Sequence, residues 1–222
     1  MIHIFTFNLF REHTMVLTST QGKSCIVVDP GFYSREERDE FFGYLESEGL
    51  TPEAVFITHG HIDHLWGAKA VQERSGAPVY MSSEDMKLAD YNGKLSYKLG
   101  LAPPDYSFSA TGVKDGDIIR AAGYAFKVIT TPGHSPGGVC YLEVNEKIMF
   151  TGDTLFAGTI GRTDLYLAEY DDLIRSVMEK LIWLDPGITI FPGHGPSSTI
   201  GVERTSNPFL EPFNEPEADT DE

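Results

Sequence analysis

The sequence predicts a mixed α/β fold in which two β-sheets pack face to face and helices cover their outer faces. Strand-like runs come first and then mix with helix-like segments, and the second half of the chain repeats this order. The chain has 222 residues, of which 41% are hydrophobic and 12% aromatic. A chain of this length and composition can bury a substantial core, and its length favours one large domain.

The chain begins with strand-like runs. Segments rich in Val, Ile, Phe and Thr predict strands over Ile2–Leu9, Met15–Ser19 and Ser24–Val28. The turn signal Asp29-Pro30-Gly31 ends the third strand.

A helix with clear start and stop signals comes next. Ser34 and Glu37 form a capping box ahead of a helix over Arg38–Glu48, and Gly49 closes it. The short apolar run Ala54–Thr58 is bounded by turn signals and predicts a buried strand.

The middle of the chain is less regular. We expect a helix over Asp63–Ser75, a strand over Val79–Met81 and a short helix over Ser83–Asp90. Asn92–Pro104 carries several helix breakers, and residues 83–105 are long for a connection. This stretch therefore reads as a functional insertion, with Tyr91 and Tyr97 lining a substrate entrance.

The second half alternates strands with one amphipathic helix. The pattern predicts strands over Tyr124–Thr130, Gly138–Val144, Lys147–Thr151 and Ile188–Phe191, and a helix over Tyr170–Leu184.

Charge limits the partners of the chain. There are 17 Lys and Arg against 33 Asp and Glu, which gives a formal net charge of −16. This charge speaks against nucleic acid and against an anionic membrane surface as partners. Residues 211–222 hold six acids and no base. We expect a domain over residues 1–210 and an acidic, disordered tail over 211–222.

We expect neither a membrane span nor a signal peptide in this sequence. Its apolar runs are far shorter than the ~20 residues of a membrane span. Met1–Phe10 has neither a basic region nor a small-residue cleavage site. Cys25 and Cys140 lie far apart in apolar surroundings and read as buried free thiols. These features favour a cytoplasmic protein.

The strongest functional signal is a histidine cluster directly after the buried strand Ala54–Thr58. It contains His59, His61, Asp63 and His64. In an extended chain, His59 and His61 point to the same side, and a turn at the start of a helix can swing Asp63 and His64 toward them. Imidazole and carboxylate are ligands for zinc, iron or manganese.

Three further candidates each follow a predicted strand and lie next to glycine: His134, Asp153 and His194. Each of them alone could be a turn residue. Together they suit one rim where several strand ends meet. Seven ligands exceed the three or four of one tetrahedral metal, but they suit two metals that share a bridging carboxylate.

These motifs resemble the metallo-β-lactamase fold superfamily, and within it the short glyoxalase II-like hydrolases of bacteria. The resemblance covers about residues 2–210. It rests on Val28-Asp29-Pro30-Gly31, the cluster His59–His64, Pro132-Gly133-His134-Ser135-Pro136-Gly137, Thr151-Gly152-Asp153-Thr154-Leu155-Phe156, Gly161-Arg162-Thr163-Asp164, Pro192-Gly193-His194-Gly195 and Asn207-Pro208-Phe209-Leu210.

The resemblance implies a four-layer αββα sandwich with the metals at one edge of the two sheets. It assigns His59, His61 and His134 to a first metal, Asp63, His64 and His194 to a second, and Asp153 to a bridging position. It also implies that Asp29 orients one of the ligands. The expected cofactors are two divalent ions, with zinc first and iron or manganese as alternatives.

The implied activity is hydrolysis of a small thioester, of the S-2-hydroxyacylglutathione type, by a metal-bridging hydroxide. Asp63 would orient that hydroxide, and a thiolate with a pKa of about 8.5 would leave without a general acid. Only 28 residues follow His194 in the sequence, so we expect a departure from glyoxalase II, whose helical C-terminal domain helps to bind glutathione.

Other interpretations remain open. Arg162 could hold a substrate carboxylate, or it could pair with Asp164. Persulfide dioxygenases of the same superfamily use one iron, here held by His59, His134 and Asp153. A lactone or ester hydrolase is a further alternative. We expect a monomer or a homodimer.

Overall fold

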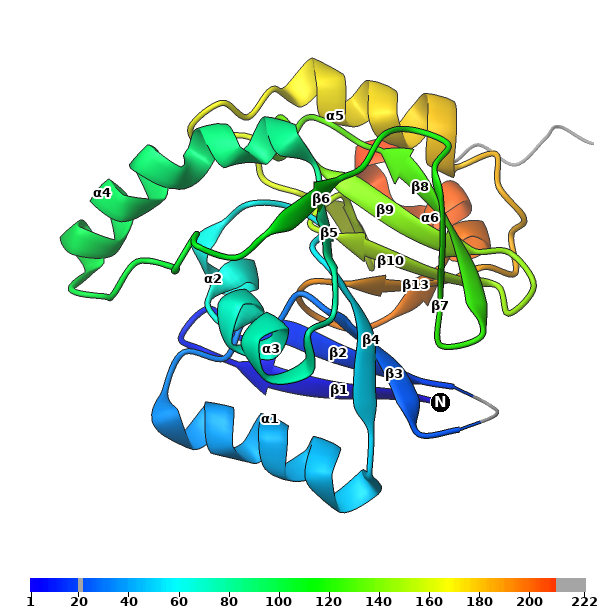
Figure 1. Cartoon of the computed structure of the whole chain (residues 1–222). Coiled ribbons are helices and arrows are strands. Elements are labelled where there is room, and N and C mark those ends of the chain that lie inside the picture. The colour runs from blue at the N-terminus through cyan, green and yellow to red at the C-terminus, as the bar shows by residue number, and fades with distance from the viewer. Residues whose placement is uncertain (20–21, 211–222) are drawn as a thin grey trace, which may run out of the picture.

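A six-stranded sheet formed by the first half of the chain faces a second sheet formed by the other half (Figure 1). The computed structural model describes residues 1–19 and 22–210. Strands of the first sheet follow chain order, antiparallel from β1 to β3 and parallel from β3 to β6. They are β1 (Ile2–Phe7), β2 (Glu12–Thr18), β3 (Ser24–Val28), β4 (Thr51–Phe56), β5 (Val79–Met81) and β6 (Ala110–Gly112).

The second sheet has the order β14-β13-β10-β9-β8-β7. Its one parallel pair is β10 with β13. The strands are β7 (Ile118–Ala121), β8 (Tyr124–Thr130), β9 (Val139–Glu143), β10 (Ile148–Gly152), β13 (Thr189–Pro192) and β14 (Ser198–Thr199). A small separate hairpin joins β11 (Leu155–Phe156) to β12 (Thr159–Ile160).

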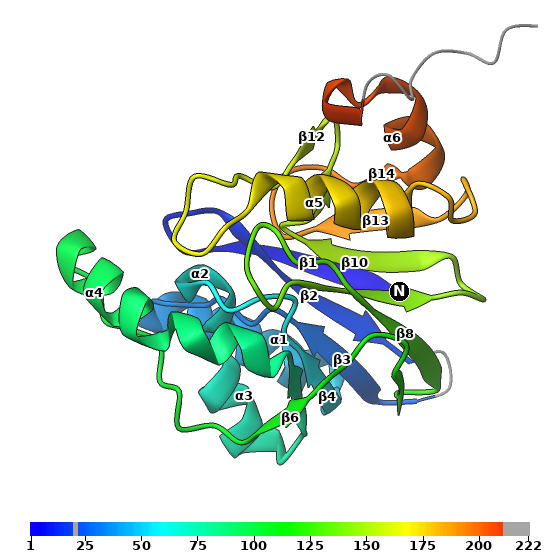
Figure 2. The same cartoon turned by 90° about the horizontal axis from the view of Figure 1, so that it is seen from above.

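Helices cover both outer faces of the sheet pair. The first sheet is covered by α1 and α3 and the second by α5 and α6, while α4 extends away from the sheets (Figure 2). The α-helices are α1 (Arg35–Glu48), α2 (Ile62–Leu65), α3 (Ala68–Ser75), α4 (Ala89–Leu99), α5 (Tyr170–Ser176) and α6 (Ile200–Ser206). Other helical turns are 3-10 at Ser83–Leu88 and Pro208–Leu210 and π-helical at Val177–Leu181.

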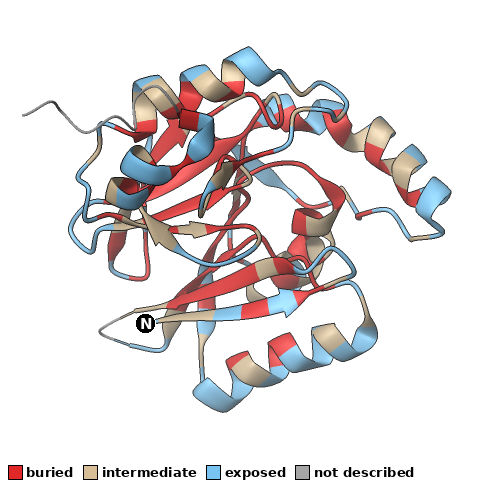
Figure 3. Ribbon diagram, turned by 180° about the vertical axis from the view of Figure 1, so that it is seen from behind, coloured by how far each residue is buried: buried red, intermediate tan, exposed pale blue. Residues whose placement is uncertain are grey.

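Three hydrophobic cores separate these four layers, because successive side chains of a strand point to opposite faces. In β2, Met15 and Leu17 belong to the core between the sheets, and Val16 belongs to the core under α1 and α3. In β9, Tyr141 faces the other sheet and Leu142 faces α5. Buried residues accordingly follow the strands in Figure 3. The predicted fold class, two facing sheets with helices outside, is confirmed.

Several predicted elements occur as expected. The strands Ser24–Val28, Val79–Met81 and Tyr124–Thr130 have the predicted bounds. Ser34 caps α1 in a capping box with Glu37, and the left-handed Gly49 ends the helix. The helix begins at Arg35 rather than Arg38 because its first turn follows the cap directly.

Two predictions for the middle of the chain are wrong. The single helix over Asp63–Ser75 is interrupted, because the amide of Gly67 donates to the Pro30 carbonyl at 2.7 Å. A side chain at Gly67 would also collide with the ring of Phe32. The irregular stretch expected over Asn92–Pro104 is largely helical, since α4 runs to Leu99 and ends at the left-handed Gly100.

The predicted acidic tail over 211–222 lies outside the described residues. Among the residues that are described, no helix has both the length and the apolar character needed to cross a bilayer.

Candidate metal centre

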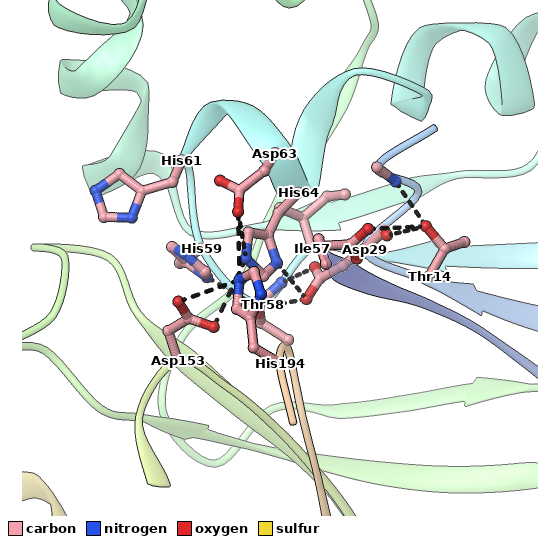
Figure 4. Close-up of polar contacts among 12 residues, drawn as sticks. Thr14, Asp29, Ile57, Thr58, His59, His61, Asp63, His64, Asp153 and His194 are labelled. Atoms are coloured by element: carbon pink, nitrogen blue, oxygen red, sulfur yellow. Dashed lines mark hydrogen bonds and ion pairs between the residues drawn. The ribbon is translucent and has the colours of Figure 1, made fainter. Parts of the chain in front are cut away.

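The predicted histidine cluster lies in the connection between β4 and α2 (Figure 4). The second half of β4, Ala54–Phe56, is apolar and buried, and His59 and His61, which follow it, are also buried. Because α2 begins at Ile62, its first turn directs Asp63 and His64 toward the other members of the cluster.

The other three candidates follow strands of the second sheet. His134 follows β8, Asp153 follows β10 and His194 follows β13. Parallel strands β10 and β13 end at the same sheet edge, which brings Asp153 and His194 together. Gly193 permits this approach, since a Cβ there would lie 2.5 Å from Oδ1 of Asp153 and 2.6 Å from Cε1 of His64.

All seven candidates come together in three overlapping groups, each with its ligand atoms within 4.8 Å of one another. The groups are His59, His61 and His134; Asp63, His64 and His194; and His59, His64 and Asp153. The first two are the trios that the family resemblance implies for two metals.

Asp153 contacts both trios. Its Oδ2 lies 3.5 Å from Nε2 of His134 and 3.7 Å from Nε2 of His194. Its Oδ1 lies 3.6 Å from Nε2 of His64. Figure 4 shows the carboxylates of Asp63 and Asp153 converging on the imidazoles of His64 and His194. Asp153 therefore lies between the two trios.

Unpaired buried atoms also indicate that these side chains fit divalent cations. Over residues 1–19 and 22–210, Nε2 of His59, His61 and His64 and Oδ1 of Asp153 are buried without a hydrogen-bond partner. Burial of an unpaired polar atom is costly. Cations held among these atoms would remove that cost, so the residues present fit a metal centre.

Burial and mutual proximity set the protonation of the first trio. Burial lowers the pKa of His59 well below its ordinary value, and the neighbouring imidazoles lower it further. Burial and the His134 ring bring the pKa of His61 to about 3. Both imidazoles are therefore neutral, which is the form that binds metal.

Carboxylates dominate the second trio. Burial alone would lower the pKa of His64, but Asp63, Asp29 and Asp153 outweigh it and raise the pKa well above the ordinary value. Burial would likewise raise the pKa of Asp63, but the imidazoles of His64 and His194 lower it overall. Asp63 is therefore an ionised hydrogen-bond acceptor.

Outward contacts fix the orientation of two rings. Oδ2 of Asp29 lies 3.1 Å from Nδ1 of His64, as the sequence resemblance implies. Asp29 is itself held by the amide and the hydroxyl of Thr58, which donate at 2.7 and 2.6 Å. The Arg162 carbonyl lies 2.8 Å from Nδ1 of His134. Both rings thus present Nε2 to the centre.

Asp85 is a positioning residue that the sequence did not reveal. Its buried Oδ2 accepts hydrogen bonds from the Gly60 amide at 2.6 Å and the Ser135 hydroxyl at 2.8 Å, and its Oδ1 accepts one from the Gly137 amide. It therefore joins the loop of His59 and His61 to the loop of His134. The only available signal was its place in the 83–105 segment.

A cavity of about 410 Å³ lies over the metal-binding side chains. His61, Asp63, His134, Asp153 and His194 line it, together with side chains from the β1–β2 turn, α4 and the 162–165 loop. Of the two tyrosines that we expect at a substrate entrance, Tyr91 lines this cavity. Tyr97, in contrast, is 87% exposed and does not line this cavity.

Arg162 lines the same cavity and pairs with Asp164. Its Nε and Nη2 donate to the two carboxylate oxygens of Asp164, both at 2.7 Å. Of the two interpretations of Arg162, the structure thus contains the ion pair, and a contact with a substrate carboxylate stays a prediction.

Comparison with known proteins places the chain in one superfamily. The family model of the Metallo-beta-lactamase superfamily matches residues 9–194, which include all seven candidates. Hydroxyacylglutathione hydrolase GloC of Haemophilus influenzae is 33% identical over 215 residues, which cover 94% of this chain and 97% of GloC.

Solved structures agree with this match. BLEG-1 B3 metallo-beta-lactamase superposes with a TM-score of 0.84 at 31% identity, covering 95% of this chain and all of BLEG-1. TTHA1623, solved in a di-iron-bound form, superposes with a TM-score of 0.82 at 31% identity, covering 94% of this chain and all of TTHA1623.

Proposed function

Because the chain belongs to the metallo-beta-lactamase superfamily and is a metallo-hydrolase, we propose that it hydrolyses a small thioester. Glyoxalase II-like thioesters, the S-2-hydroxyacylglutathiones, are the reference substrates because GloC is named for that activity. One observation carries the proposal: Asp153 contacts both trios of ligands beneath a cavity open to a small molecule. The net charge of −16 supports a small-molecule substrate over nucleic acid.

We propose two zinc ions in this centre. His59, His61 and His134 would hold one, Asp63, His64 and His194 the other, and Asp153 would contact both. Imidazole with carboxylate suits zinc, and it also suits iron, the metal in the TTHA1623 structure. Metal analysis of the purified protein decides between them.

The chain's own groups fit thioester hydrolysis. Divalent ions, when bound, would lower the pKa of a water molecule to about 7 and polarise the substrate carbonyl. Ionised Asp63 accepts a hydrogen bond from the attacking water and aims it at that carbonyl. A thiol has a pKa of about 8.5, so the leaving group departs as thiolate without a protonating side chain.

The test combines metal content with a panel of thioesters that includes lactoylglutathione. Thiol release is followed with a chromogenic reagent. We expect two metal ions per chain and release that falls at least a hundredfold in Asp63→Ala. Asp39→Ala, which removes an exposed acid of α1, serves as the matched control.

Two results would overturn the proposal. Thiol release by Asp63→Ala as fast as by the unaltered protein on every substrate would exclude the assigned site. Alternatively, one iron per chain with oxygen uptake on a persulfide would identify a dioxygenase.

A further inference from the structure

The cavity over the metal centre has a polar floor and an apolar wall. Metal-binding side chains form the floor. The wall is formed by Phe10 from the β1–β2 turn, Leu95 and Leu99 from α4, and Leu165 from the loop after Asp164. Phe10 is 37% and Leu99 47% exposed, so this apolar surface reaches the mouth of the cavity. A group extending from the reacting carbonyl toward solvent therefore passes between hydrocarbon side chains.

The same cavity offers little to a strongly charged substrate. Within the described part of the chain, Arg162 is the one Lys or Arg that lines it, and its Nε and Nη2 already donate to the carboxylate of Asp164. Lys94 and Lys98 of α4 line an adjoining hollow that shares Tyr91 and Leu95 with the cavity, and neither lysine lines the cavity itself. A glutathione thioester brings two carboxylates and one ammonium group, and two carboxylates would need more cationic partners than this wall supplies.

We propose that the site selects thioesters that carry an apolar acyl or thiol group over thioesters of glutathione. This inference rests on the proposed thioester hydrolysis and names the substrate class of that activity. The carbonyl lies at the metal floor, and the apolar group packs against Phe10, Leu95 and Leu99. Each buried methylene then adds to binding by the hydrophobic effect.

Contacts of Asn92 and Tyr91 fix the position of helix α4, which supplies part of this wall. Asn92, buried on α4, donates to the Gly60 carbonyl at 2.6 Å, which ties the helix to the loop that carries His59 and His61. The neighbouring residue of α4, Tyr91, stacks on Tyr166 with ring centroids 4.8 Å apart, which ties the helix to the loop after Leu165. The apolar wall and the metal floor are thus parts of one packed unit, so that the wall does not need to form when substrate binds.

The test uses two substrate series on the metal-loaded protein. One series lengthens a straight acyl chain from two to eight carbons on a fixed small thiol, and the other lengthens the thiol on a fixed acetyl group. In at least one series, we expect kcat/KM to rise roughly three- to fivefold per methylene. The longer members should exceed lactoylglutathione, and the responsive series identifies the side on which the apolar group lies.

Variants of α4 locate the effect. Leu95→Ala and Leu99→Ala should flatten the dependence on chain length. Tyr97→Ala, on the same helix but outside the cavity, should retain it. Calorimetric binding of non-hydrolysable alkyl thioethers should follow the same order of length and the same order of variants. This second readout does not depend on turnover.

The outcomes separate the two proposals. If thioesters are hydrolysed without dependence on chain length, or with lactoylglutathione preferred, the apolar substrate class is wrong and thioester hydrolysis stands. If no thioester in either series is hydrolysed, the proposed function is wrong and the substrate class falls with it.

Discussion

The buried carboxylate of Asp85 accepts a 2.6 Å hydrogen bond from the amide of Gly60, the residue between two candidate metal ligands. The same oxygen also accepts from Ser135, next to His134. One side chain outside the ligand set thus sets the distance between the two loops that carry His59, His61 and His134.

Replacing this acid tests that role. Asp85→Asn puts an NH₂ group in place of a carboxylate oxygen that accepts hydrogen bonds. At least one of the three groups that donate to Asp85 would then face another donor. Metal affinity should fall about 10- to 100-fold, as when other groups that orient ligands are lost. Competition with a chromophoric chelator measures this change. Asp90→Asn, which alters an exposed acid of α4, is the control and should bind metal normally. Equal affinity in both variants would exclude the role of Asp85.

Two glycines should respond to alanine in opposite ways. Gly133 has φ of 139°, and a Cβ there would collide with the backbone nitrogen of Leu173, so Gly133→Ala should destabilise the fold by about 3 kcal/mol. Gly93 lies within α4 with open space around it, so Gly93→Ala should stabilise by up to ~1 kcal/mol. Urea unfolding measures both. Shifts of the same sign would contradict this account.

Both cysteines are reduced and fully buried. Burial raises the pKa of Cys25 from its ordinary value of 9.0 to about 12 and that of Cys140 to about 11. The folded state therefore keeps thiol protons that the unfolded state releases above pH 9. Each thiol contributes stability that is complete below pH 9 and is lost as pH rises through the folded-state pKa.

Alkaline titration checks this sign. The free energy of unfolding should fall above pH 9, with each thiol contributing a slope of about 1.4 kcal/mol per pH unit. Cys140→Ala should show a shallower fall than the unaltered chain. At pH 8 the native protein should resist thiol reagents, and the urea-unfolded protein should react at both cysteines. Rapid labelling of the native form would contradict the burial.

Metal removal should weaken the fold. Without a cation, the buried Nε2 atoms of His59, His61 and His64 are unpaired. An ion present at 1,000 times its Kd would stabilise by about 4 kcal/mol, so dialysis against a chelator should lower Tm by about 10 °C. Added zinc should restore it, and calcium, which prefers oxygen ligands, should not. An unchanged Tm after complete removal would show that metal contributes nothing to stability.

The layers of the fold could be predicted because a continuous apolar strand such as β9 must be covered on both faces, and every residue of β9 is buried. The break at Gly67 could not, since it depends on the Pro30 carbonyl and the Phe32 ring, which are distant in sequence. Helix α4 was missed for a related reason. Its Gly93 disfavours a helix locally, and its anchor, the contact of Asn92 with Gly60, exists only in the folded chain.

The residues of the candidate site could be predicted from the sequence more completely than the fold around them. Its seven side chains sit in short motifs at strand ends, so their residue types and spacing indicated a metal centre before any geometry was known. Asp85 has no such motif, because its role comes from three donors on two remote loops. Arg162 left two interpretations open, and only the position of the Asp164 carboxylate relative to its guanidinium reveals the ion pair.

The ligand trios also cut across the two halves of the chain. The first sheet supplies His59, His61, Asp63 and His64, whereas His134, Asp153 and His194 come from the ends of strands in the second sheet. Neither half alone can complete a trio. A nascent chain that has made only its first sheet therefore lacks a complete trio. A metal ion can bind with full affinity only after the second sheet has docked on the first, so metal binding would favour correct assembly of both halves.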